Sequence, residues 1–390
     1  MSVAGSLALA AVRLHPLECW LPSGRGHRWR RPAALLGATA LLLLVLWAAV
    51  RGGMPYDFRI FRRAGVAVLD HRAPYPHLPL TDAVRHHHPF VYPLPAAWLF
   101  APFALLGFWT GAWLFAGLSI AAFLTGTWWL GVRSIPAFLL VMTSSVVVAS
   151  LGYGTIDAVL YLGIAALVRF RHRPGLSATV FVLLVLLKPL MLPLAVYVLA
   201  TGRLRALAAM VVAGVVAAVG SLAIGFSAVG YVHLLQQLSE AEAPQSRGVI
   251  ERVVIDAGWS LGTATAVVSV IGGTLLLVTL IAGLRGRIDH RVVLAVAVGS
   301  ALVVSPIVWS HYAALCWAPL LLLRRTTLVA AVVWLASWLL FPAPLHNLWL
   351  PGPVEWRWDD AAAAAVPIAT MLVVALATLG SRRRGRSLHI

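Results

Sequence analysis

Long apolar runs separated by short basic segments dominate the hydropathy pattern of this chain. Six of these runs are each long enough to cross a hydrocarbon core of ~30 Å as a helix. They lie near residues 33–51, 109–131, 135–151, 204–226, 262–284 and 361–380. The alternation typical of barrel strands is missing, and helices are the other structure that satisfies backbone hydrogen bonds in lipid. The pattern predicts an all-α integral membrane protein.

Two proline-containing segments leave the number of crossings open. If residues 92–108 span the membrane, alternation places the basic stretch Arg169–Pro174 outside, against the positive-inside tendency. If residues 92–108 instead enter the membrane and return to the same side, the run 174–201 must break at Lys188-Pro189 into two short spans. Both solutions give about twelve crossings.

Two segments between the spans have amphipathic patterns. The sequence FRIFRRAGVAVL, in the loop 52–92, puts Phe58 and Phe61 on one side and Arg59 and Arg62 on the other. This predicts a helix in the membrane interface, with its arginines towards headgroups or phosphate. In the loop 227–260, YVHLLQQLSEA predicts a second surface helix. We expect both loops on the side opposite the termini.

Composition supports the membrane assignment, since 61% of residues are hydrophobic and 11% charged, against about 25% charged in soluble proteins. The net charge of +17 does not indicate nucleic-acid binding, because the arginines flank the apolar runs as the positive-inside rule predicts. Basic clusters near both ends place the termini in the cytoplasm. We therefore expect a cytoplasmic segment (1–32), a polytopic membrane domain (33–380) and a cytoplasmic tail (381–390).

One acid differs in position from the others. Asp57 stands just beyond the first apolar run, where the membrane surface meets the loop, and a partly desolvated carboxylate there can act as a general base. Alternatively, it pairs with Arg62 or caps the surface helix. Asp157 lies at the mouth of an apolar run, where an N-cap role is one option. We expect Asp289, in a basic loop, only to solvate that loop.

Two cations in apolar surroundings are candidates for binding an anion. Lys188 lies in VFVLLVLLKPLMLPL, where a charge costs about 2.5–3.5 kcal/mol at mid-membrane. It should therefore face a polar cavity or a phosphate, or else snorkel to the interface. His311 follows SPIVWS at an expected helix start, where an imidazole can donate to an anion.

Other candidate features carry less information. Three consecutive histidines in RHHHPF cannot all face one ion, so we expect His88 to face solvent or phosphate, with metal binding less favoured. Aromatic residues expected to face outside, such as Trp259 and Trp309, can stack on sugars. Neither a Walker loop nor a Rossmann glycine fingerprint is present. An enzyme of this kind would take an activated substrate from the membrane, and we expect no cofactor.

Four segments in order along the chain resemble glycosyltransferase family 87. DFRIFRRAGVAVLDHRAPY resembles its first-loop signature, and FVYPLPAAWLFAPFALL its tyrosine-proline-proline segment. VLLVLLKPLMLPLAVYVL is similar to its lysine-x-x-proline helix, and SPIVWSHYAALCWAPLLLL to its serine-proline-x-x-tryptophan-x-histidine segment. There are three departures. They are Tyr92-Pro93-Leu94-Pro95, Gly152-Tyr153-Gly154-Thr155 without the family's glutamine, and His311-Tyr312 in place of two histidines.

The resemblance implies a C-type glycosyltransferase (GT-C) fold of about twelve helices in the plasma membrane, with an extracytoplasmic active site. It implies inverting transfer of mannose from polyprenyl-phosphate mannose to a phosphatidylinositol mannoside or lipomannan acceptor, forming an α-1,2 linkage. The general base would be Asp57, with no metal required. Phosphate-binding cations would be Arg59, Arg62, Lys188 and His311, and substrate contacts would come from Tyr92, His88 and Trp309.

Three alternatives remain. The donor can carry arabinofuranose instead of mannose, the protein can transport a lipid-linked sugar, or it can be a non-catalytic scaffold of the cell envelope. The absence of internal repeats argues against a transporter. The sequence leaves the oligomeric state open.

Overall fold

The computed structural model describes residues 55–75, 89–242, 257–305, 309–323, 326–340 and 357–386. Within these residues every regular element is a helix. In chain order they are α2 (Tyr56–Leu69), α4 (Leu94–Ala104), α5 (Phe108–Trp129), α6 (Ile135–Met142), α7 (Ser145–Tyr153), α8 (Asp157–Arg169), α9 (Pro174–Leu187), η2 (Pro189–Met191), α10 (Leu194–Ala223), α11 (Ala228–Glu242), α13 (Leu261–Leu284), α14 (His290–Val304), η3 (Ser310–Cys316), α15 (Trp317–Leu320), α16 (Thr326–Leu340) and α18 (Arg357–Arg386). The predicted all-α class is confirmed for this part of the chain.

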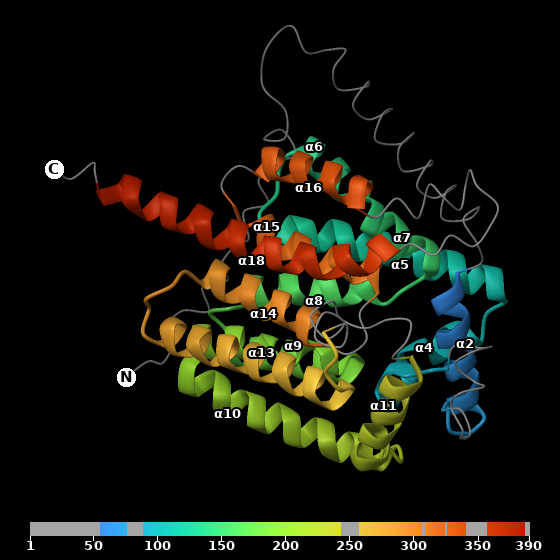
Figure 1. Ribbon diagram of the computed structural model, residues 1–390. Helices are drawn as coiled ribbons and strands as arrows, with labels where there is room; N and C mark the ends of the chain where they lie inside the picture. The colour runs from blue at the N-terminus through green and yellow to red at the C-terminus, as the bar shows by residue number, and fades with distance from the viewer. Residues whose placement is uncertain are drawn as a thin grey trace, which may run out of the picture.

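Several apolar helices lie side by side, and the amphipathic helices α2 and α11 gather with α4 at one end. Figure 1 shows α10, α13, α14 and α18 beside one another, with α2, α4 and α11 together at the right of the view. The predicted apolar run 33–51 and the N-terminal segment 1–32 fall outside the described residues.

Three helices are long and apolar enough to cross a membrane: α5, α10 and α13. The pair α6 and α7 makes a fourth if it counts as one span, broken by a bend of 54°. The other apolar helical segments are 10–17 residues long, and at 1.5 Å per residue they reach less than the ~30 Å of a hydrocarbon core. The expected number of about twelve crossings is therefore not confirmed within the described residues.

The chain breaks at Lys188, as the second topology requires. Helix α9 ends at Leu187, and Lys188 is extended, with φ −155° and ψ 111°. The prolines that follow, Pro189 and Pro193, lack the N–H needed to continue a helix. A short 3-10 turn, η2, joins the two helices, so the Lys188 side chain leaves the backbone at an interruption between apolar helices.

The amphipathic helix expected after the first run is α2. Its apolar side is buried against α4, where the Phe61 and Phe100 rings stack at 4.3 Å between centroids. A Cβ at Gly65 would lie 2.7 Å from the Phe100 carbonyl oxygen, so only glycine allows the two helices to approach this closely. The second predicted surface helix is α11. Both helix predictions are confirmed, while their position outside the cytoplasm stays a prediction.

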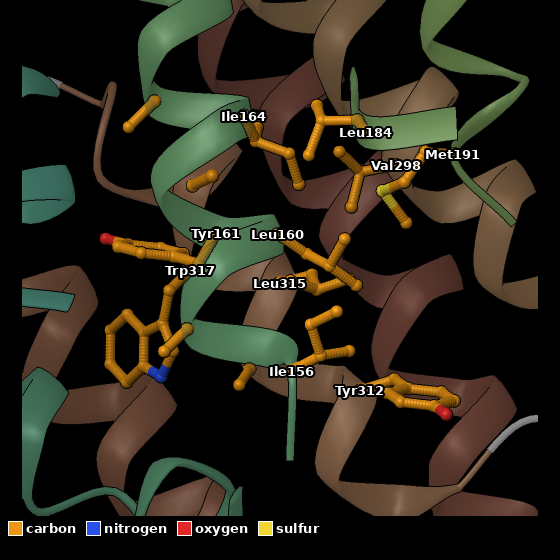
Figure 2. Packing of buried hydrophobic residues seen from close by; sticks show 14 of the residues in the cluster. Ile156, Leu160, Tyr161, Ile164, Leu184, Met191, Val298, Tyr312, Leu315 and Trp317 are labelled. Carbon is orange, nitrogen blue, oxygen red and sulfur yellow. The ribbon is translucent and has the colours of Figure 1, made fainter. Parts of the chain in front are cut away.

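Helix α8 runs through the buried core. Figure 2 shows its residues Leu160 and Ile164 between side chains from α9, α14 and the η3–α15 segment. Tyr312 lies near Ile156, at the N-terminal end of α8. This packing brings the start of α8 and the turns of η3 together.

Asp289 differs from expectation. Its carboxylate accepts a hydrogen bond from the Arg291 N–H at 2.8 Å and caps the first turn of α14. The expectation that Asp289 only solvates its loop was therefore wrong, because the residue stands directly before a helix with unsatisfied N–H groups.

Candidate active site

Asp57 lies in the first turn of α2, and the turn between α7 and α8 packs directly against it. Gly154 in this turn has a left-handed backbone with φ 68°. A Cβ there would lie 2.8 Å from Cβ of Phe58 and 3.2 Å from Cβ of Pro55. Glycine thus satisfies both the backbone conformation and the close approach. The consequence is that the start of α8 faces the start of α2.

The first residue of α8, Asp157, forms a buried pair with His311. Its Oδ2 is 2.6 Å from Nδ1 of His311, and the two side chains are 0% and 6% exposed. A buried carboxylate needs such a partner, because the loss of hydration is otherwise uncompensated. With Nδ1 donating to Asp157, Nε2 of His311 is left for another group. The N-cap role considered for Asp157 was wrong, since Ile156 occupies that position.

Lys188 is held by two tyrosines rather than by a carboxylate. Its Nζ donates to the hydroxyls of Tyr92, at 3.4 Å, and Tyr312. The same ammonium lies over both rings, 4.9 Å and 3.6 Å from their centroids. Cation–π contacts position the charge without neutralising it. The Lys188 ammonium can therefore still bind an anion.

These residues act on one another electrostatically, and we call Asp57, Asp157, Lys188 and His311 the charged cluster. Burial raises the pKa of Asp57 above its ordinary value, and the negative charge of Asp157 adds to this effect. The positive charges of His311 and Lys188 lower that pKa, but do not outweigh burial. In the described part of the chain, no group donates a hydrogen bond to the Asp57 carboxylate. Such a carboxylate is well suited to accept a proton from a hydroxyl.

The two candidate arginines of α2 point elsewhere. The Arg62 guanidinium donates to the carbonyls of Leu106, at 2.9 Å, and Ala104, at 3.5 Å, around the end of α4. The Arg59 guanidinium lies over the Phe108 ring, 5.8 Å from its centroid. The considered pairing of Asp57 with Arg62 was therefore wrong, because the free carbonyls at the end of α4 bind Arg62 instead.

Of the remaining candidates, Tyr92 and Trp309 are among the described residues. Tyr92 contacts Lys188, as described, and Trp309 precedes η3 with 37% of its surface exposed. His88 lies outside the described residues. Among the residues that the structure describes, no three His, Cys, Asp or Glu side chains gather in a way that could hold a metal ion.

Sequence reasoning missed two members of the site, Asp157 and Tyr312. For Asp157, the available signal was an acid two residues after the glycine turn GYGT and at the start of an apolar run. For Tyr312, the only signal was its position next to His311, where the family has a second histidine. Neither signal identifies a partner far along the chain.

Comparison with known proteins gives one match. The family described as glycosyltransferase family 87 matches residues 90–306, which is more than half of the chain. The matched region contains Tyr92, Asp157 and Lys188, while Asp57 precedes it and His311 follows it. No curated protein and no solved structure matches. The protein is therefore a membrane glycosyltransferase: this chain belongs to glycosyltransferase family 87.

Proposed function

We propose that this glycosyltransferase moves mannose from polyprenyl-phosphate mannose to a lipid-linked acceptor of the phosphatidylinositol mannoside or lipomannan type. The transfer proceeds with inversion and forms an α-1,2 linkage. The observation that carries the proposal is the partly buried carboxylate of Asp57, at the start of an amphipathic helix and within electrostatic reach of Lys188 and His311. The choice of mannose and of the linkage rests on the motif resemblance.

In this mechanism Asp57 is the general base. Its carboxylate takes the proton of the acceptor hydroxyl while that oxygen attacks the anomeric carbon of the sugar. The bond between the anomeric carbon and the phosphate oxygen breaks, and its electron pair leaves with polyprenyl phosphate. A single in-line displacement turns a β-linked donor into an α-glycoside.

Lys188 and His311 stabilise the leaving phosphate. Preorganised cations in a site of low dielectric stabilise charge that develops in the transition state. The phenols of Tyr92 and Tyr312 hold the Lys188 ammonium in place, and Asp157 orients the His311 ring. Asp157 is thus a positioning residue. We retain Arg59 as a candidate for the phosphate and assign Arg62 to the packing of α2 on α4.

We further propose a GT-C architecture in the plasma membrane, with the charged cluster on the extracytoplasmic side and both termini in the cytoplasm. The amphipathic character of α2 supports this arrangement, since such a helix lies in a membrane interface and meets lipid-linked substrates there.

The test is transfer of radiolabelled mannose from polyprenyl-phosphate mannose to purified phosphatidylinositol mannosides. We expect Asp57→Asn to abolish transfer by a folded protein. Asp289→Asn is the matched control, because asparagine caps a helix as well as aspartate does and this site lies away from the cluster. Equal transfer by wild type and Asp57→Asn would reject Asp57 as the base. Transfer from polyprenyl-phosphate arabinose alone would reject mannose as the sugar.

A further inference from the structure

A cavity of about 560 Å³ lies at the end of α2 away from Asp57. Its walls come from the C-terminal end of α2, the start of α4, the turn after α10 and α11. The volume falls within the ~300–1,000 Å³ typical of small-molecule sites. Its lining includes the side chains of His71, Arg72, His233, Trp98, Tyr75 and Tyr231.

One side of this cavity is basic. Helix α2 ends with hydrogen bonds from the N–H of Arg72 to the Ala67 carbonyl, at 2.8 Å, and from His71 to Val68, at 3.2 Å. This is a Schellman motif, in which glycine is the usual left-handed residue. Here that position is His71, with φ 56°, a conformation unfavourable for a side chain with a Cβ. The motif directs two basic residues to the cavity, where His233 joins them from α11.

Among the described residues that line the cavity there is no carboxylate. Asp70, just outside it, pairs with Arg72 at 2.6 Å, but both side chains are exposed to solvent. An exposed ion pair of this kind contributes little, and a guanidinium has five N–H donors. Arg72 therefore retains the capacity to bind an anion, which indicates a ligand with a negative charge.

Another part of the lining is apolar and partly exposed. Trp98 on α4 and Ile224 after α10 are 40% and 39% exposed. In α11, Val229 and Val232 flank the lining residues Gly230 and Tyr231 in the chain and are 69% and 52% exposed. In a membrane protein, such a surface faces lipid chains. A ligand that fills the cavity and also covers this surface has an anionic head and an apolar tail.

The cavity shares a wall with the charged cluster. Tyr75 donates to the Tyr92 carbonyl at 3.2 Å, and Tyr231 donates to the Val91 carbonyl at 2.9 Å. Both tyrosines line the cavity, while the Tyr92 side chain contacts Lys188. A headgroup in the cavity therefore lies against the same short segment that holds Lys188.

We propose that this cavity binds the phosphate of an anionic glycerophospholipid and that this lipid is the acceptor. Naming it the acceptor rests on the proposed function, whereas lipid binding itself does not. Two lipid phosphates must be present during the reaction. Lys188 and His311 account for the donor phosphate, and His71, Arg72 and His233 form a separate set for the acceptor phosphate.

The test measures lipid binding without any donor. The purified full-length protein is placed in phosphatidylcholine nanodiscs and titrated with acyl-labelled phosphatidylinositol. We expect the double variant R72Q/H233Q to bind at least about tenfold more weakly, because hydrogen bonds to a charged phosphate are lost. The control R205Q/H172Q removes the same two residue types at exposed positions outside the cavity and should leave binding unchanged. Equal binding by R72Q/H233Q and wild type would overturn the proposal.

A second pair of variants separates binding from folding. Glycine at position 71 relieves the left-handed strain, so H71G should melt at a higher temperature and yet bind phosphatidylinositol more weakly. Arg203 is the other non-glycine residue of the described chain with a positive φ, at 52°, and it lies outside the cavity. R203G should therefore melt higher with unchanged binding. A gain in stability without loss of lipid binding in H71G would overturn the assignment of His71.

Two further measurements identify the lipid. In the first, undecaprenyl phosphate competes with labelled phosphatidylinositol. If it displaces the label, and R72Q/H233Q binds both lipids equally weakly, the cavity belongs to the donor and the acceptor assignment is overturned. Asp57→Asn should bind phosphatidylinositol like wild type. If wild type fails to transfer mannose but binds the lipid as described, the proposed function fails while the lipid site stands.

Discussion

Asp157 and His311 lie 154 positions apart in the chain, and yet their Oδ2 and Nδ1 atoms are 2.6 Å apart in the buried centre of the protein. This contact joins the start of α8 to η3, beneath the first turn of α2. Both residues of this contact act electrostatically on Asp57. The geometry of the candidate site therefore depends on how three segments that are distant in the chain pack together.

Replacing Asp157 tests whether it acts through His311. Asp157→Asn keeps the size of the side chain but removes the charge that orients the imidazole. We expect kcat to fall about 100-fold, in the range of a lost acid–base contribution, with the KM for acceptor unchanged. Because the two residues act as a unit, D157N/H311Q should be no slower than H311Q. Additive losses in kcat would show that Asp157 acts independently of His311.

The pH dependence of transfer reports the ionisation of Asp57. The base must be deprotonated, so activity falls as the pH drops through the pKa of Asp57. Because burial raises that pKa, the acidic limb should lie above the ~3.9 of an ordinary aspartate. The charge of Lys188 lowers the pKa of Asp57. In Lys188→Gln, the acidic limb of the residual activity should therefore move to higher pH. The measurement is kcat against pH in nanodiscs, and a limb that moves to lower pH would contradict the assignment.

Gly154 allows the close approach of α8 and α2, and its replacement should disturb the site. Gly154→Ala adds a left-handed strain of about 1–2 kcal/mol and a clash with Phe58 and Pro55. Gly131→Ala is a matched control, because Gly131 also has a positive φ but nothing within 4 Å of an added Cβ. Both variants should melt at lower temperature, while only Gly154→Ala should lose most of its transfer activity. Similar activity in both would show that the close contact does not position Asp57.

Lys188 and Arg62 should behave differently, although both were candidates for the phosphate. Lys188→Gln should lower kcat/KM for the donor by about 100-fold, because a cation near the leaving phosphate is lost. Arg62→Gln should instead destabilise the fold by about 1–3 kcal/mol, since the carbonyls at the end of α4 lose their donor. Steady-state kinetics and thermal unfolding separate the two effects. A large increase in donor KM for a stable Arg62→Gln protein would return Arg62 to the phosphate site.

Much of the local structure follows from the sequence alone. The 3.6-residue period of Phe58, Phe61 and Val68 predicts α2 and its buried side, because helix geometry places residues of that spacing on one face. Proline chemistry predicts the break at Lys188, since a residue without an N–H cannot continue the hydrogen-bond ladder. The order of weak motifs indicated the family and singled out Asp57. All of these signals are local or depend on order along the chain.

Only the tertiary structure decided which of these residues meet. Arg62 belonged to the predicted phosphate set, but its guanidinium donates to carbonyls at the end of α4. Asp157 resembled a helix cap until the fold brought His311 beside it, and Tyr312 became relevant only through Lys188. The basic cavity is built by the ends of α2 and α10 together with α4 and α11. Pairings of this kind depend on how distant helices pack, and neither hydrophobic period nor residue type specifies that packing.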